Sequence, residues 1–169
     1  MGRRASIVVL FALASVPAAS AEPLPRAPAP ASRPSVLACN AADIKTAMND
    51  AAASAGSADA TAAARAAFRS RVESCVALRL EWAKTSTSGP TTWFRARTSI
   101  GDYFFALWQG GALVGSKPDE AYWVRCDATT MTQTDRNLGR LVCTYGAAPI
   151  KPAEFEAFSL SIQTTGPGP

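Results

Sequence analysis

The sequence has 169 residues, of which 48% are hydrophobic and 18% are charged, and its 17 Lys and Arg residues exceed its 13 Asp and Glu residues by four. This composition is typical of a folded globular protein and not of a disordered chain. The sequence contains no histidine, which excludes Ser-His-Asp and Cys-His nucleophiles and all zinc sites that use histidine. The composition therefore argues against most familiar catalysts, and we expect no metal site.

Residues 1–21 have the features of a secretory signal peptide. Arg3 and Arg4 precede an apolar run over residues 5–16, and small residues at 19–21 predict cleavage before Glu22. The run is too short for a membrane span, which needs about 20 apolar residues. The chain is thus expected to be exported, to the periplasm or beyond. Without Arg3 and Arg4 the formal net charge is 15 − 13 = +2. No basic patch in the sequence indicates nucleic-acid binding.

The exported part is expected to have three segments. Residues 22–36 form a linker with five prolines, which predicts an extended, exposed spacer because proline cannot donate a backbone hydrogen bond. A single domain is expected over residues 37–165. The Gly-Pro-Gly-Pro sequence at residues 166–169 predicts a flexible tail.

The domain is expected to begin with an alanine-rich helical hairpin. Of the 46 residues from 39 to 84, 16 are alanine, and residues 54–57 interrupt the helical pattern. Asn40 is a suitable N-cap for the first helix, and the second is expected to start near Asp59. Small side chains would let the two helices approach closely as antiparallel neighbours.

The cysteines fit this hairpin. The four cysteines show no CxxC spacing, which disfavours a zinc knuckle or a thioredoxin motif. Cys39 and Cys75 have their midpoint at residue 57, inside the predicted turn, so an antiparallel hairpin brings them together. Export favours a disulfide between them, and buried free thiols are the alternative. Cys126 and Cys143 lie on predicted strands around a loop centred near residues 134 and 135, which predicts a second disulfide.

Short helices and strands are expected in the second half of the chain. An alternation of apolar and charged residues predicts a strand at 78–82. An amphipathic helix is expected from Trp93 to Trp108, followed by a capped helical turn at 116–120. Further strands are expected at 122–126, 140–145 and 154–162. In the last of these, pairing should begin near Glu154, because Pro149 and Pro152 cannot donate to a ladder.

Several collinear motifs carry a family resemblance. They read IGDYFFALWQGGALVG from residue 100, KPDEAYWVRCD from residue 117, TTMTQTD from residue 129, NLGRL from residue 137 and AAPIKPAEF from residue 147. Together they resemble the C-terminal domain of contractile phage tail sheath proteins, most strongly over residues 100–158. The resemblance implies an α+β fold, in which a small mixed or antiparallel sheet of three or four strands is covered by helices. It also implies a structural protein with no catalytic residue and no cofactor.

The resemblance further implies binding through a sheet edge. Sheath subunits are joined by exchanged terminal strands, in which an arm completes a neighbour's sheet. The matching segment of this chain gives five candidate interaction residues: Glu154, Phe155, Phe158, Leu160 and Ile162. Phe158, Leu160 and Ile162 form the apolar face of the last strand and should pack on the helices. We therefore expect a prophage-derived sheath-type domain that is mainly monomeric and binds a protein at an open sheet edge.

An exported hydrolase or carbohydrate-binding protein is the alternative. It would use surface carboxylate pairs, namely Asp119 with Glu120 and Glu154 with Glu156. Asp127 and Asp135 flank a Thr-rich loop that suggests a calcium site, but the spacing lacks the DxDxDG pattern and its Glu, which favours turn capping. Trp108, Tyr122 and Trp123 would form its aromatic platform. Capping, turn formation and core packing are the ordinary roles of these residues, because no substrate cleft is indicated by their spacing.

Overall fold

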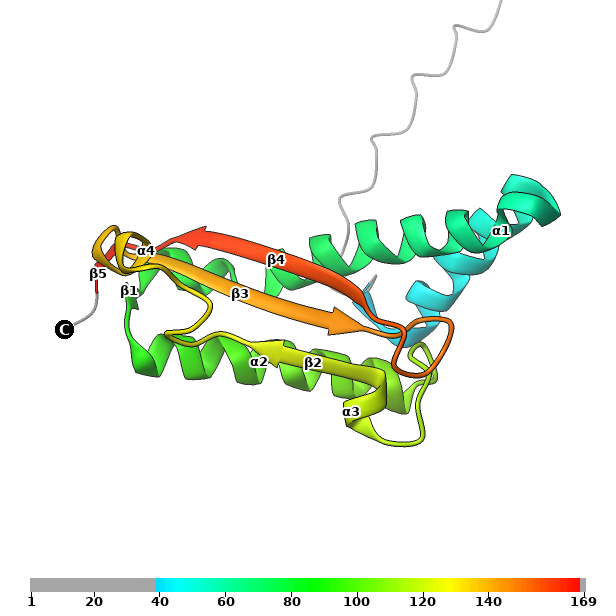
Figure 1. Cartoon of the computed structure of the whole chain (residues 1–169). Coiled ribbons are helices and arrows are strands. Elements are labelled where there is room, and N and C mark those ends of the chain that lie inside the picture. The colour runs from blue at the N-terminus through cyan, green and yellow to red at the C-terminus, as the bar shows by residue number, and fades with distance from the viewer. Residues whose placement is uncertain (1–38, 168–169) are drawn as a thin grey trace, which may run out of the picture. The chain divides into compact units, whose positions relative to one another are not determined.

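Figure 1 shows the computed structural model of the chain, which describes residues 39–167. The expected signal peptide at 1–21 and the linker at 22–36 lie outside the described residues. The helices are α1 (Ala41–Arg79), the 3-10 helix η2 (Glu81–Thr85), α2 (Pro90–Gln109), α3 (Pro118–Ala121) and α4 (Gln133–Asn137). The strands are β1 (Thr87–Ser88), β2 (Tyr122–Arg125), β3 (Arg140–Ala147), β4 (Glu156–Gln163) and β5 (Gly166–Pro167). This combination of helices and strands confirms the predicted α+β class.

Helix α1 folds back on itself and forms the predicted hairpin. Gly56 interrupts the helix with φ 75° and ψ 170°, a left-handed φ that glycine adopts without strain. A straight helix of this length would extend about 58 Å, whereas the Cα atoms of Cys39 and Cys75 are 5.7 Å apart and joined by a disulfide. The two arms are visible in Figure 1. The hairpin, its turn and its bridge are therefore as the sequence predicts.

The segment after α1 differs from the prediction. Residues 78–82 form the end of α1 and the start of η2 rather than a strand. Leu80 is fully buried and its N–H donates to the Val76 and Ala77 carbonyls, so the helical hydrogen bonds continue past Arg79. A period of two over five residues is too short to distinguish a strand from a helix end that buries alternate residues.

The main sheet is antiparallel and has the strand order β2-β3-β4. Val124 pairs with Tyr145, and Tyr145 pairs with Phe158. Figure 1 shows α1 and α2 behind one face of this sheet and the other face open. The core lies between the sheet and the helices, and its largest fully buried side chains include Phe68, Ile100, Tyr103, Phe104, Leu141 and Tyr145.

The C-terminal residues form two strands. β4 starts at Glu156, two residues later than expected, after Ala153 adopts φ 59°. Gly166–Pro167 pairs in parallel with Thr87–Ser88, so the first half of the expected flexible tail is a short strand. Thr165 N–H donates to the Ser86 carbonyl at 3.0 Å and supports this pairing. Within residues 39–167, no helix is long and apolar enough to cross a membrane.

Candidate protein-interaction site

The outer edge of β4 has no neighbouring strand in the main sheet. Thr164 N–H donates to the Gly139 carbonyl at 3.1 Å. Because neighbouring residues of an antiparallel strand direct their backbone polar groups to opposite sides, the groups of Ala157, Ser159 and Ser161 are directed away from β3. Arg69 confirms this direction, since its Nη1 donates to the Ala157 carbonyl at 3.1 Å. Beyond Ala157, Ser159 and Ser161 are exposed.

A groove runs beside this edge. It has a volume of about 380 Å³ and is lined by Ala77 of α1, by Glu81 and Lys84 of η2, and by residues 160–163 of β4. Glu81 and Lys84 form an ion pair with an N–O distance of 2.7 Å. The groove therefore places one charge pair and several apolar groups next to the open edge.

The opposite end of β4 is attached to α1 by ion pairs. Arg65 binds Glu154, and its Nη1 is 2.8 Å from Glu156 Oε1. Arg69 Nη1 is 3.2 Å from Glu156 Oε2, and its guanidinium lies 4.8 Å from the centre of the Phe158 ring. Hydrogen bonding to Arg65 lowers the pKa of Glu154. This cluster attaches the start of β4 to its own domain.

The five candidate interaction residues have different surroundings. Phe158 and Ile162 are buried, and Leu160 is half-buried against the core, as the predicted apolar face requires. Phe158 packs on Phe68 of α1, with ring centres 6.3 Å apart. Glu154 lies in the Arg65 cluster, and Phe155 is half-buried. Their role in partner binding remains a prediction.

Sequence reasoning missed the residues that define this edge. Ser159 and Ser161 are small polar residues between apolar ones, a pattern that indicates only a solvent-facing side. Arg65 and Arg69 are four residues apart on one helix face, and this spacing could have indicated a shared acidic partner.

The second open edge, at β2, is shorter. β2 has four residues, and the N–H of Tyr122 donates to the carbonyl of Pro118, the first residue of α3. Trp123 lies over Gly146 on the open face of the sheet. The β2 edge therefore offers fewer free backbone groups than β4.

Three of the other candidate carboxylates have local structural partners. The hydroxyl and the backbone N–H of Thr129 both donate to Asp127 Oδ1, the N–H at 2.8 Å, and these two hydrogen bonds lower the pKa of Asp127. Asp135 and Thr132 form the capping box of α4, and hydrogen bonds from Thr132 lower the pKa of Asp135. Glu120 Oε2 accepts from Ser116 N–H at 2.8 Å. A lowered pKa suits a carboxylate acceptor and not a general acid at neutral pH.

The structure does not bring the candidate aromatic residues onto one platform. Trp108 Nε1 donates to the Gly115 carbonyl at 2.9 Å. Tyr122 stacks on Phe104 on the helix-covered face, with ring centres 5.8 Å apart, whereas Trp123 lies on the opposite face of the sheet. In residues 39–167, no group of three or more Cys, Asp or Glu side chains could hold a metal ion.

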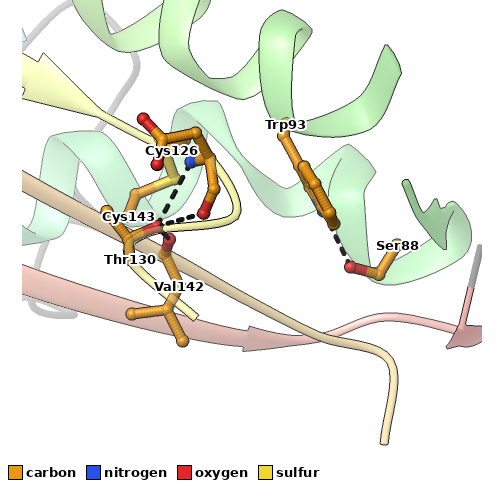
Figure 2. The surroundings of a disulfide bond; sticks show 7 residues. Ser88, Trp93, Cys126, Thr130, Val142 and Cys143 are labelled. Carbon is orange, nitrogen blue, oxygen red and sulfur yellow. Dashed lines mark hydrogen bonds between the residues drawn. A yellow bond between two sulfur atoms is a disulfide. The ribbon is translucent and has the colours of Figure 1, made fainter. Parts of the chain in front are cut away.

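The predicted Cys126–Cys143 pair is also a disulfide, with Cα atoms 4.4 Å apart. Figure 2 shows this bridge beside Thr130, whose Oγ1 donates to the Val142 carbonyl at 2.7 Å. Nearby, Trp93 Nε1 donates to Ser88 Oγ at 3.0 Å. The bridge and the Thr130 bond both connect the loop after β2 to β3.

Comparison with known proteins relates this fold to contractile injection systems. No protein-family model and no curated protein matches the chain. One similar solved structure is the anti-feeding prophage baseplate, with 34% identity and a TM-score of 0.50 over 58% of this chain. Another is the PVC sheath complex of an extracellular contractile injection system in its contracted state, with 31% identity and a TM-score of 0.49 over 58% of this chain.

The chain spans 27% of the length of the baseplate protein and 28% of the sheath protein. The domain that the structure describes is a contractile-tail sheath-like domain, which confirms the resemblance carried by the sequence motifs. Its likeness to the baseplate protein supports a structural module.

Proposed function

We propose that this chain is an exported, non-enzymatic interaction module of prophage origin, which binds a protein partner along the outer edge of β4. Its likeness to a contractile-system baseplate protein supports a structural role. The pattern of residues 1–21 supports export, and two disulfides suit an oxidising compartment.

The single observation that carries the proposal is the free edge of β4. An exposed strand edge can accept an added strand, whose main-chain hydrogen bonds give affinity and whose side chains enter adjacent pockets. β4 has eight residues, and Ser159 and Ser161 in its second half are exposed. The groove beside residues 160–163 provides space for alternate side chains of such a strand.

The partner contributes the added strand in this proposal. β4 already pairs along its whole length with β3 of the same chain, and Arg65 attaches its start to α1. It is therefore not free to serve as a donated arm. The purified chain is expected to be mainly monomeric at micromolar concentration, and light scattering across a concentration series measures this.

Site-specific crosslinking in the producing cell tests the binding edge. The photo-crosslinker p-benzoylphenylalanine at Ser161 should capture a protein partner, whereas the same group at exposed Lys117 should not. Ser159→Pro should abolish the Ser161 crosslink, because it removes an outward N–H without breaking the β3–β4 ladder. Ser159→Ala keeps this N–H and should retain the crosslink.

Thermal melts of both variants make the result interpretable. The proposal requires Ser159→Pro to keep a melting temperature close to that of Ser159→Ala while it loses the crosslink. Equal crosslinking in the two folded variants would overturn the use of the β4 edge. A crosslink found only when the probe replaces Val124 would assign binding to the β2 edge instead.

A further inference from the structure

The outer face of α2 carries a regular seam of aromatic and small residues. Along this face, which lies away from the core, the residues follow one another at alternating spacings of three and four positions. This is the spacing of a helix surface that packs lengthwise on a second helix. None of the seam residues is buried, and they are Thr91, Phe94, Thr98, Gly101, Phe105 and Trp108.

Two aromatic side chains stand out from the seam. Phe94 is 63% exposed and Phe105 is 40% exposed, whereas the opposite face of α2 is buried in the core. Thr98 and Gly101 lie between the two rings and are small, so the backbone of another helix can approach closely at the centre of the seam. The face therefore has a narrow centre with an aromatic ring on either side.

Two opposite charges lie beside the seam. Arg95 and Asp102 are both exposed, and among the ion pairs of residues 39–167 none involves either of them. The Arg95 guanidinium lies over the Trp82 ring, 3.9 Å from its centre, and such stacking leaves its N–H groups able to donate. Because Arg95 and Asp102 are seven residues apart, nearly two full turns, they lie on the same flank of the seam.

We propose that a second copy of this chain packs on this face, with the two α2 helices antiparallel and related by a two-fold axis. The axis lies between residues 99 and 100, which is the midpoint of Phe94 and Phe105 and also of Thr98 and Gly101. Each Phe94 ring then lies against Phe105 of the other copy, and the small residues meet at the centre. Antiparallel helices also place opposite dipole ends side by side.

Charge complementarity identifies the second copy as the occupant. Across a two-fold axis of this kind the same flank of each helix meets, so Arg95 of one copy faces Asp102 of the other. The midpoint of these two residues is one position from the axis, which offsets them by about 3 Å along the helix, a distance that an arginine side chain spans. Since every contact of a two-fold interface occurs twice, the pairing forms two ion pairs.

The pairing is expected to be weak. One helix face is smaller than the roughly 800 Å² that each partner buries in a standard interface. The chain should therefore be mainly monomeric at micromolar concentration and dimeric only when concentrated. The proposal does not depend on the β4 edge, because no residue of α2 lines the groove there.

Sedimentation equilibrium of the full chain tests the proposal, over concentrations from about 10 μM to about 1 mM that cover weak association. The wild type should dimerise toward the upper end. Arg95→Glu and Asp102→Arg should each weaken dimerisation at least about tenfold, because each brings like charges together twice. Arg125→Glu is the matched control, since it reverses a charge that also lies over an indole but on the open face of the sheet. This control should dimerise like the wild type.

Mixing the two charge variants is the decisive measurement. In a mixed dimer of Arg95→Glu with Asp102→Arg, both flanking contacts again join opposite charges. The mixture should therefore associate about as well as the wild type, although neither variant does so alone. Melting temperatures establish that each variant is folded. A wild type that stays monomeric over the whole range, or a mixture of folded variants that does not associate, would overturn the proposal.

Two further variants test the register of the helices. A parallel pair would place Arg97 against Asp102 of the second copy, because flanking residues five positions apart meet across a parallel seam. Rescue of Asp102→Arg by Arg97→Glu and not by Arg95→Glu would overturn the antiparallel arrangement. Phe94→Ser removes a largely exposed ring and should weaken dimerisation while the monomer stays folded. Unchanged dimerisation of this variant would also overturn the proposal.

Discussion

Trp123 covers Gly146 on the open face of the sheet. The two residues are directly paired on β2 and β3, and a Cβ atom at position 146 would overlap Nε1 of the indole. Arg125 lies over the same indole, 5.7 Å from its centre. The missing side chain of Gly146 is therefore the reason that this tryptophan can lie flat on the sheet.

Gly146→Ala should consequently destabilise the domain, by about 1–3 kcal/mol as is usual for overpacking. The added methyl group must displace the indole or shift the paired strands. In Trp123→Ala the overlap is absent, so the double variant should be more stable than the sum of the two single effects predicts. Urea unfolding of the four proteins measures this coupling, and strict additivity would contradict the packing argument.

The attachment of β4 to α1 should be sensitive to acid. Arg65 lowers the pKa of Glu154 in the folded state. The interaction between Arg65 and Glu154 therefore contributes its full stabilisation at pH values above the ordinary glutamate pKa. The contribution is lost as the pH falls through the lowered value. Arg65→Met should therefore reduce stability at neutral pH, and its difference from the wild type should shrink in acid.

Unfolding of both proteins from pH 7 down to the acid limit checks this effect. Asp127 and Asp135 also have lowered pKa values, but they contribute equally to both proteins and cancel in the difference. Arg71→Met is the matched control on the same helix, because Arg71 has no ion pair among residues 39–167. A pH-independent difference for Arg65→Met would reject this account.

The two disulfides should stabilise the protein by different amounts. Their cysteines are 36 and 17 residues apart. Loop entropy predicts a loss of about 4 kcal/mol when Cys39 and Cys75 are both replaced by alanine, and about 3 kcal/mol for Cys126 and Cys143. Non-reducing peptide mapping of exported protein should recover both bridges. Free thiols at Cys39 and Cys75 would contradict the expected oxidation.

Hydrolytic activity should be absent. The sequence has no histidine, and the candidate carboxylates Asp127, Asp135 and Glu154 have local hydrogen-bond partners and lowered pKa values. The purified chain should therefore not turn over esters, peptides or peptidoglycan. Turnover that is lost in Asp127→Ala or Glu154→Ala would reverse the non-enzyme proposal. If the protein binds peptidoglycan without turnover and the Trp123→Ala variant does not bind it, the result would instead support carbohydrate binding.

Much of the fold could be predicted because its determinants are local or paired. Gly56 ends a helical pattern, and Cys39 and Cys75 lie almost symmetrically around it. The sum 126 + 143 equals the sum 125 + 144 of the observed Arg125–Thr144 pair, so the second cysteine pair indicated the strand register. Alternation along β4 indicated which side chains would be buried.

Other features depend on contacts that no local pattern shows. The pairing of Gly166–Pro167 with Thr87–Ser88 joins segments about 80 residues apart and uses two residues from each, too few to produce a periodic signal. The groove beside β4 is formed by Ala77 of α1, by η2 and by residues 160–163. The proximity of these segments depends on the packing of α1 and η2 against the sheet.

The bridge across the arms of α1 has a consequence for the fate of the hairpin after cleavage. The tip around Gly56 is exposed, and exposed loop tips with small residues are common sites of proteolytic attack. A single backbone cut there would leave both arms covalently joined through Cys39 and Cys75. Nicked protein would then run as one species on a denaturing gel and release its shorter fragment only after reduction.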